Sequence, residues 1–208
     1  MTKAIESHAN KTVLGAGEVY IDVLDAAGKR TGERYVGDST GASVSATTER
    51  TTIFSGDGAV ARTLLDKITS VNHTMSVTIQ DMQPENFALF LAGEVEEVAD
   101  GSTSANEAIE VKAGLWYQLG VKNTAAGRAG AAKEIKAAVR YIEDDATGLG
   151  NGSNWYIRQA TVGPAGELAL KDRSTPQAIG LQILVEVPAI AGEEGHPAIL
   201  VDGAPYGS

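Results

Sequence analysis

Apolar and polar residues alternate along several short stretches of this chain. Residues 18–23 and 75–80 alternate strictly, and this period of two places every second side chain on one face of a β-strand. Residues 154–162 are rich in aromatic and β-branched side chains, which suit a pleated surface. Residues 181–187 form a further apolar strand that ends before Pro188, because proline cannot donate to a strand ladder. The pattern predicts a mainly β protein.

One stretch has the spacing of a helix instead. It begins at Asp81 or Met82, Pro84 suits the first helical turn, and Gly93 ends it. Residues 125–139 are rich in alanine but interrupted by glycine, and we interpret them as a loop that runs into a strand. The sequence therefore predicts one short α-helix beside the strands.

Two segments lack the alternation of a half-buried strand. Residues 49–64 contain Gly56 and Gly58 and are interpreted as a long link that projects from the domain. Residues 191–208 are rich in glycine and proline and carry three acids and no base, which is typical of an extended arm. We expect one β-sandwich domain over residues 1–190, with the projecting loop 49–64, and a C-terminal arm over residues 191–208.

The link over residues 49–64 also carries apolar side chains that have no place in an alternating strand. Exposed on a single chain, they would form a patch of the kind that marks an interaction site. Two arginines in the link could meet an acidic surface on a partner and fix the register. The candidate contact residues are Arg50, Ile53, Phe54, Val60, Arg62 and Leu64, with Leu65 directly after them.

Composition excludes several classes of protein. The formal net charge is −10 and no basic cluster is present, so a groove that grips nucleic acid through lysine and arginine is not expected. The chain has no cysteine, which excludes disulfides and thiolate zinc sites. It lacks the run of about 20 apolar residues that a membrane helix needs, so we expect no membrane binding. The first ten residues are polar, unlike a signal peptide, so we expect synthesis in a cytoplasm.

No group of residues has the spacing of a catalytic, cofactor or metal site. The glycine-rich residues 148–152 precede a strand-like stretch, whereas a phosphate-binding loop precedes a helix. The three histidines His8, His73 and His196 are not at metal-ligand spacing. The paired carboxylates at 96–97 and 143–145 are interpreted as solvated acidic loops rather than calcium or glycosidase sites. We predict that the chain is not an enzyme and binds no cofactor.

The order of features from residue 74 to residue 93 resembles the major tail tube proteins of long-tailed, siphovirus-like bacteriophages. An alternating strand ends at Asp81, Pro84-Glu85-Asn86 follows, and a short apolar helix runs to Gly93. The opening residues 14–20, before a polar hairpin, are also similar. The resemblance implies a β-sandwich or barrel-type fold with one flanking helix and extended loop and terminal arms.

The resemblance further implies a structural role in a virion. Such subunits form hexameric rings that stack into a hollow tail tube, through which DNA is ejected without specific binding. Other copies of the chain, a tail terminator, a tape measure protein and a distal tail protein are the implied partners, with assembly in the host cytoplasm. The link 49–64 would then contact the next ring. An acidic lumen is expected, with Glu18, Asp22 and Glu186 as candidates on polar strand faces.

Other functions stay open at the level of sequence. One alternative is another self-assembling virion protein, such as a tail terminator or a capsid decoration protein. A different class is a secreted carbohydrate-binding or calcium-binding β-sandwich, which the low aromatic content of 5% disfavours. A hydrolase that uses scattered carboxylates is the weakest alternative.

Overall fold

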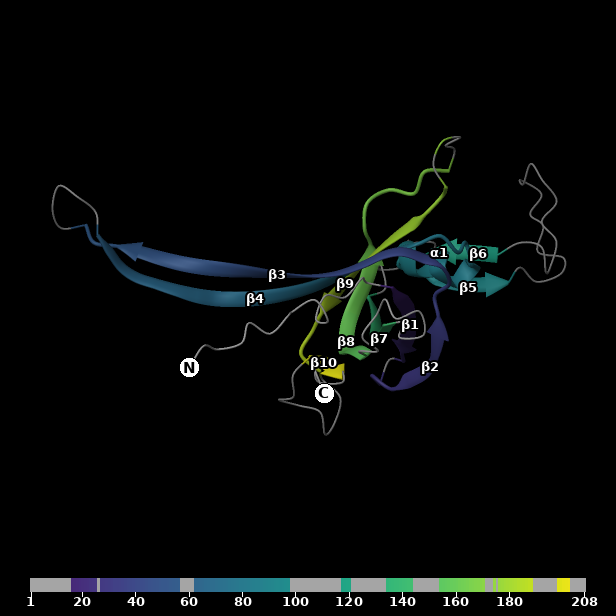
Figure 1. Cartoon of the computed structure of the whole chain (residues 1–208), viewed down its shortest axis with the longest axis horizontal. Helices are drawn as coiled ribbons and strands as arrows, with labels where there is room; N and C mark the ends of the chain where they lie inside the picture. The colour runs from purple at the N-terminus through teal and green to yellow at the C-terminus, as the bar shows by residue number, and fades with distance from the viewer. Residues whose placement is uncertain are drawn as a thin grey trace, which may run out of the picture.

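The structure is a computed structural model that describes residues 16–25, 27–56, 62–97, 117–120, 134–143, 154–170, 174, 176–188 and 198–202. Within these residues the chain forms β-strands and one short helix (Figure 1). The elements are β1 Gly17–Leu24, β2 Arg30–Tyr35, β3 Ser39–Phe54, β4 Thr63–Ile79, α1 Pro84–Phe90, β5 Glu94–Glu97, β6 Tyr117–Gly120, β7 Ile135–Glu143, β8 Asn154–Pro164, β9 Ile179–Val185 and β10 Ile199–Asp202.

Eight strands form one antiparallel sheet in the order β2-β1-β7-β8-β9-β4-β3, and β10 pairs with β8. The sheet branches at β8, because β9 pairs with residues 160–164 of this strand and β10 pairs with residues 154–157 on the same side. Strands β5 and β6 form a separate two-stranded sheet. The predicted mainly β fold with one short flanking helix is confirmed.

The core lies on one face of the large sheet, which curls around it. Buried and less buried residues alternate over Val19–Ile21 of β1, Met75–Ile79 of β4 and Ile179–Ile183 of β9, because successive side chains of a strand point to opposite faces. The strands predicted near residues 18–23, 75–80, 154–162 and 181–187 are confirmed as β1, the end of β4, β8 and β9. Side chains from β1, β4, β7, β8 and β9 meet in one cluster, which includes Val19, Met75, Val139, Ile157 and Ile183.

Helix α1 begins at Pro84, two or three residues after the start predicted at Asp81 or Met82, and ends at Phe90, before the predicted stop at Gly93. Leu89 packs into the core cluster, and Asn86 is completely buried. The strand expected at the end of residues 125–139 is also present as the start of β7, whereas residues 121–133 lie outside the described residues.

The segment 49–64 differs from its prediction as an irregular link. Its first part completes β3, its last residues begin β4, and residues 57–61 lie outside the described part of the chain. The two strands pair along their whole length, but only Thr74–Ile79 of β4 also pair with β9. We call residues 46–54 and 63–73 the β3–β4 ribbon, which projects far from the body of the domain (Figure 1). Cross-strand hydrogen bonds hold this segment extended, although neither of its faces is buried.

The predicted C-terminal arm is also partly a strand. Ile199–Asp202 form β10, with Leu200 opposite Tyr156 and Val201 opposite Trp155. The apolar run Ile199-Leu200-Val201 explains this pairing, since such side chains fit a pleated surface. Residues 191–197 and 203–208 of the predicted arm lie outside the described residues.

Candidate assembly interface

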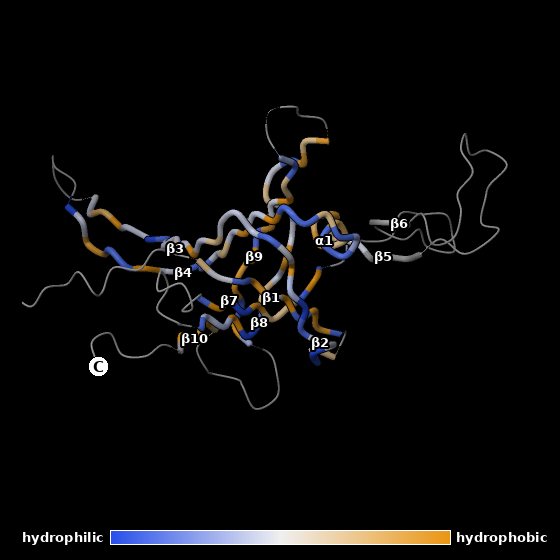
Figure 2. Tube along the Cα trace, turned by 45° about the vertical axis from the view of Figure 1, so that its right-hand side comes forward, coloured by the Kyte–Doolittle hydropathy of each residue, from blue (hydrophilic) through white to orange (hydrophobic). Residues whose placement is uncertain are grey.

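The outer end of the β3–β4 ribbon presents large apolar side chains to solvent. Phe54 is 59% exposed and Leu64 is 68% exposed, and Ile53 lies directly opposite Leu65 across the two strands. We call Ile53, Phe54, Leu64 and Leu65 the apolar tip. Ile68 and Val71 extend the exposed apolar surface toward the body, and Figure 2 shows hydrophobic and polar positions interspersed along both strands. The four residues of the apolar tip are the described apolar residues that the sequence marked as contact candidates, whereas Val60 lies outside the described part.

The two arginines of the tip region have different surroundings. Arg50 donates from Nε to Asp66 Oδ1 at 3.1 Å and from Nη2 to Asp66 Oδ2 at 2.7 Å. This bidentate ion pair occupies the Arg50 guanidinium within its own chain. Arg62 is exposed beside the tip, where its carbonyl oxygen accepts a hydrogen bond from the Ser55 amide at 2.7 Å. Arg62 is therefore the better placed of the two to meet an acidic partner.

The ends of the large sheet are open strand edges. Within the described residues β3 pairs only with β4, and β2 pairs only with β1. Unpaired amide and carbonyl groups on such edges are ready to pair with another chain. Among the described residues the sheet thus offers a long open edge along β3 and a short one along β2, and residues 63–73 of β4 are also unpaired on the side away from β3.

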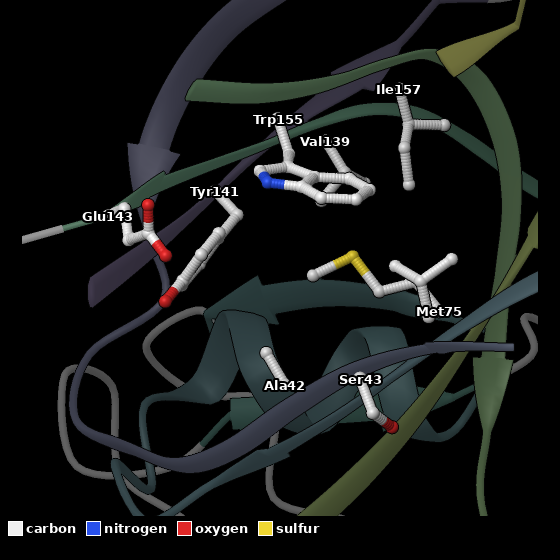
Figure 3. A pocket seen from close by; sticks show the side chains of 9 residues that line it. Ala42, Ser43, Met75, Val139, Tyr141, Glu143, Trp155 and Ile157 are labelled. Atoms are coloured by element: carbon white, nitrogen blue, oxygen red, sulfur yellow. The ribbon is translucent and has the colours of Figure 1, made fainter. Parts of the chain in front are cut away.

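A cavity of about 310 Å³ opens at the base of the ribbon. Figure 3 shows Trp155, Val139 and Ile157 on one wall and Met75 on the facing wall, with Glu143 beside Tyr141 at one end. We call this cavity the base pocket. Its principal lining residues are Ala42 and Val44 of β3, Met75 of β4, Val139 and Tyr141 of β7, and Trp155 of β8.

The base pocket is not evident in the sequence, because its walls come from strands far apart in the chain. Tyr141 lies directly opposite Trp155 in the β7–β8 pairing. The only signal in the sequence is the placement of an aromatic residue near the end of each of these strands, and that signal becomes informative only when their register is known.

The three residues proposed to face a lumen have different roles within the chain. Glu18 is exposed and accepts a hydrogen bond from the Tyr20 hydroxyl at 2.6 Å. This bond is the main reason why the pKa of Tyr20 is raised. Asp22 is only 8% exposed, and its Oδ1 accepts from the amides of Thr31 at 3.1 Å and Gly32 at 2.9 Å. Asp22 therefore stabilises the β1–β2 hairpin, and little of its carboxylate surface is accessible to a lumen.

Glu186 belongs to a polar network on the outer face of β7, β8 and β9. Its Oε1 accepts from Lys136 Nζ and from the Thr161 hydroxyl, both at 2.5 Å, and its Oε2 accepts from Gln159 Nε2 at 3.1 Å. Burial works to raise the pKa of Glu186, but these hydrogen bonds and the charge of Lys136 outweigh it and lower the pKa. Lys136 balances much of the charge that Glu186 would bring to a lumen.

A second charged cluster crosses the outer face of β2, β1 and β7. Arg140 donates from Nε to Glu33 Oε1 at 2.8 Å and lies 4.9 Å above the ring centre of Tyr20. The Tyr20 ring in turn lies 5.5 Å from that of Tyr35. This cluster joins β7 to the hairpin of β1 and β2, which lies far earlier in the sequence, and it explains why polar residues occupy the outer positions of β1.

The described residues contain neither a cluster of metal-ligating side chains nor a membrane-spanning helix. Histidine, aspartate and glutamate side chains there do not gather in any group of three or more that could hold a metal ion. None of the helical segments described is both long and apolar enough to cross a membrane.

Comparison with known proteins gives one family and several solved structures. Residues 12–148 match the family described as "Protein of unknown function UCP028589". No curated protein matches the chain.

The solved structures similar to this chain include components of phage-like contractile injection systems. A chain from the baseplate of the anti-feeding prophage is 12% identical, with a TM-score of 0.44 and coverage of 92% of this chain and 95% of that one. A chain from the cap of the same particle is 10% identical, with a TM-score of 0.36 and coverage of 98% and 100%. A chain from the extended sheath–tube complex of an extracellular contractile injection system, PVC, is 11% identical, with a TM-score of 0.34 and coverage of 98% and 100%.

Proposed function

We propose that this chain, which belongs to the family of unknown function matched by residues 12–148, is the structural subunit of a phage-type tail tube. In this proposal copies of the chain form hexameric rings, and the rings stack into a hollow tube through which DNA leaves the virion. A tail terminator, a tape measure protein and a distal tail protein would adjoin the tube. The resemblance of residues 74–93 to siphovirus-like tail tube proteins motivates this assignment.

The observation that carries the proposal is the β3–β4 ribbon with its apolar tip. A two-stranded ribbon is marginally stable alone in water, and its exposed tip side chains contribute no free energy of burial in a lone subunit. Burial of each large tip side chain against another copy would contribute about 1.5–3 kcal/mol, less the entropy lost when the ribbon is ordered. These properties support a contact between the ribbon and another subunit.

The open sheet edges support association within a ring. Pairing of β3 in one copy with an edge strand of the next would remove both exposed ladders. Such a contact uses two different surfaces, and contacts of this type generate closed rings when the rotation between copies closes.

The charge of the chain suits a passage for DNA. The net charge of −10 repels a polyanion rather than holding it. Glu18 is the candidate best placed to contribute, since its carboxylate is exposed and bears no ion pair among the described residues.

Electron microscopy of tip variants tests the proposal. The purified wild-type chain should form rings and tubes, and the double variant Ile53→Ser/Phe54→Ser should give folded subunits or single rings that no longer stack. The matched control is Leu170→Ser/Val187→Ser, because these side chains are 78% and 75% exposed but lie off the ribbon. Control tubes should have normal length.

Other outcomes separate the alternatives. Normal tubes from the Ile53→Ser/Phe54→Ser variant would eliminate the ribbon as the stacking element. Discs that cap a tube would indicate a tail terminator, and isolated knobs a capsid decoration protein. A wild-type chain that stays monomeric in light scattering at high concentration would refute tube formation.

A further inference from the structure

The base pocket and the apolar tip are complementary in chemistry. The pocket walls are mostly apolar, with Met75, Val139 and Trp155 facing its interior (Figure 3). The tip carries Phe54 and Leu64, which are among the most exposed large apolar side chains of the described residues. A cavity of about 310 Å³ lies at the small end of the range for ligand pockets, which suits one or two side chains.

The charges at the two surfaces are also complementary. Glu143 lies at one end of the base pocket, beside Tyr141. Arg62 is exposed next to the apolar tip. If Phe54 enters the pocket, Arg62 and Glu143 can approach each other at its rim, where an arginine–carboxylate pair adds geometric specificity.

The tip cannot reach the pocket of its own chain. Val44 lines the pocket and Phe54 ends the same strand. At about 3.3 Å per residue of strand, the tip lies roughly 30 Å from the pocket. The two strands pair continuously over this distance, so the ribbon does not fold back. A ribbon tip that enters the pocket must therefore come from another molecule.

We propose that the apolar tip of one copy fills the base pocket of a second copy, with Phe54 as the anchor and Arg62 facing Glu143. This inference rests on the proposed self-assembly and names the surface that receives the ribbon. Each copy then gives a tip and accepts a tip, so the contact is head-to-tail and propagates from copy to copy. The base pocket is filled only in the assembly.

Disulfide trapping tests this contact. The chain has no cysteine of its own, so only the introduced thiols can form disulfides. Thr63 lies opposite Phe54 in the ribbon and Ala42 lines the pocket. Chains with Ala42→Cys are mixed with chains carrying Thr63→Cys, and disulfide-linked dimers are measured under mild oxidation. The control mixes Thr63→Cys with Gln182→Cys, since Gln182 is exposed on the outer face of β9.

The expected result is a linked dimer between the Ala42→Cys and Thr63→Cys chains, formed roughly tenfold or more faster than in the control mixture, because docking raises the effective thiol concentration. Phe54→Ser in the Thr63→Cys chain should reduce this rate to the control rate. If Ala42→Cys fails to fold, Glu143→Cys provides the pocket thiol.

Three outcomes overturn the inference in different ways. Equal rates in both mixtures, with tubes present in electron micrographs, would reject docking in the pocket and leave the proposed tube function standing. Monomers without any linked product would reject both. A rapid disulfide within single chains of a Leu14→Cys/Ala42→Cys variant would show that the chain's own N-terminal segment fills the pocket.

Discussion

The side-chain amide of Asn86 is fully buried and joins three segments of the chain. Its Nδ2 donates to the carbonyl oxygens of Val36 at 2.8 Å and Asp81 at 3.0 Å, and its Oδ1 accepts from Arg34 Nη2 at 2.8 Å. The polar groups of this amide are thus paired in an otherwise apolar region, which is the condition under which a buried amide stabilises a fold. Asn86 fixes α1 to β2 and to the connection between β2 and β3.

The variant Asn86→Ala should lower the free energy of unfolding by about 1–3 kcal/mol, because the carbonyl and guanidinium groups left behind lose a buried partner. Chemical denaturation measures the change. The matched control is Gln83→Ala one turn earlier, where the side chain is exposed and bonds only to Asp81 among the described residues at 2.7 Å. An Asn86→Ala variant as stable as Gln83→Ala would contradict the account.

Glu186 and Lys136 give a pH dependence whose direction follows from their pKa values. The pKa of Glu186 lies below its ordinary 4.5, so its contribution to stability is present above pH 4.5 and is lost as the pH falls through the lowered pKa. Burial works to lower the pKa of Lys136, but the hydrogen bond that Lys136 donates to Glu186 helps to raise it above 10.5, so that contribution is present below pH 10.5 and is lost as the pH rises past the raised pKa.

The variant Glu186→Gln should therefore be less stable than the wild type by about 1 kcal/mol near neutral pH, which is a typical size for a partly exposed ion pair with added hydrogen bonds. Denaturation at a series of pH values measures the difference. It should shrink in strong acid, where both chains carry a neutral side chain at this position. A difference that is constant across the acid range would show that the charge of Glu186 is not its cause.

At the scale of the residue, the sequence predicted the secondary structure in which a residue lies better than the contacts that its side chain makes. The Pro84-Glu85-Asn86 stretch was recognisable, but nothing in the sequence reveals that Asn86 is buried. Asp22 has the alternation of a surface carboxylate, and its burial depends on two amides of the following hairpin. Such roles depend on the turn geometry and on contacts between distant segments.

At the scale of the element, the start of the β3–β4 hairpin depends on a glycine. Gly37 has a φ of +89°, and a Cβ built there would lie 2.3 Å from the Cβ of Asp81. Most other residues would be strained at this φ and would also displace the segment before α1. The connection between β2 and β3 is therefore restricted in conformation and in space.

Gly37→Ala should lower the free energy of unfolding by about 1–3 kcal/mol or more, as expected for strained backbone at a crowded position. Gly41→Ala is the matched control within β3, because a Cβ there meets nothing within 4 Å and the backbone does not need glycine. Thermal unfolding of both variants measures the effect. Equal melting temperatures would show that this connection adapts without strain.

The sequence predicted the buried strands but not the ribbon, for a physical reason. Alternation reports that one face of a strand is buried, as in β1 and β9. Both faces of the ribbon are exposed, so its apolar residues follow no simple period. Register shifts near Arg50 and Phe54 disturb the pattern further. The apolar residues proposed for contact are exposed where the structure describes them, and their contact with another copy stays a prediction.

At the scale of the whole molecule, the pattern of the sequence does not predict the order of the strands in the sheet. β7 lies between β1 and β8, and β9 lies between β8 and β4. These neighbours are set by packing of the shared core, which involves residues far apart in the chain. The base pocket depends on this order, since its walls are β3 and β4 on one side and β7 and β8 on the other.

The acidic character of the molecule gives a prediction for DNA. Assembled wild-type particles should not retain duplex DNA at physiological salt, because binding requires cations that neutralise phosphates. If Glu18 lines the lumen, Glu18→Lys particles should retain DNA in a salt-dependent manner, whereas Glu49→Lys on the exposed ribbon should do so less. Filter retention across a salt series measures this. Retention of DNA by the wild type, or equal retention by both variants, would argue against an acidic lumen at Glu18.

The ribbon also sets a time course for polymerisation. Two strands without a packed face open and close by local unfolding, so their amide hydrogens should exchange quickly with deuterium in a lone subunit. Docking orders the ribbon and should slow that exchange. The fraction of subunits that have joined an assembly can therefore be measured from the deuterium uptake of residues 46–54. When the first subunits associate, the ribbon must become ordered against few contacts. A subunit that joins the end of an existing assembly meets a surface that is already formed. Growth should therefore begin after a lag that preformed seeds abolish.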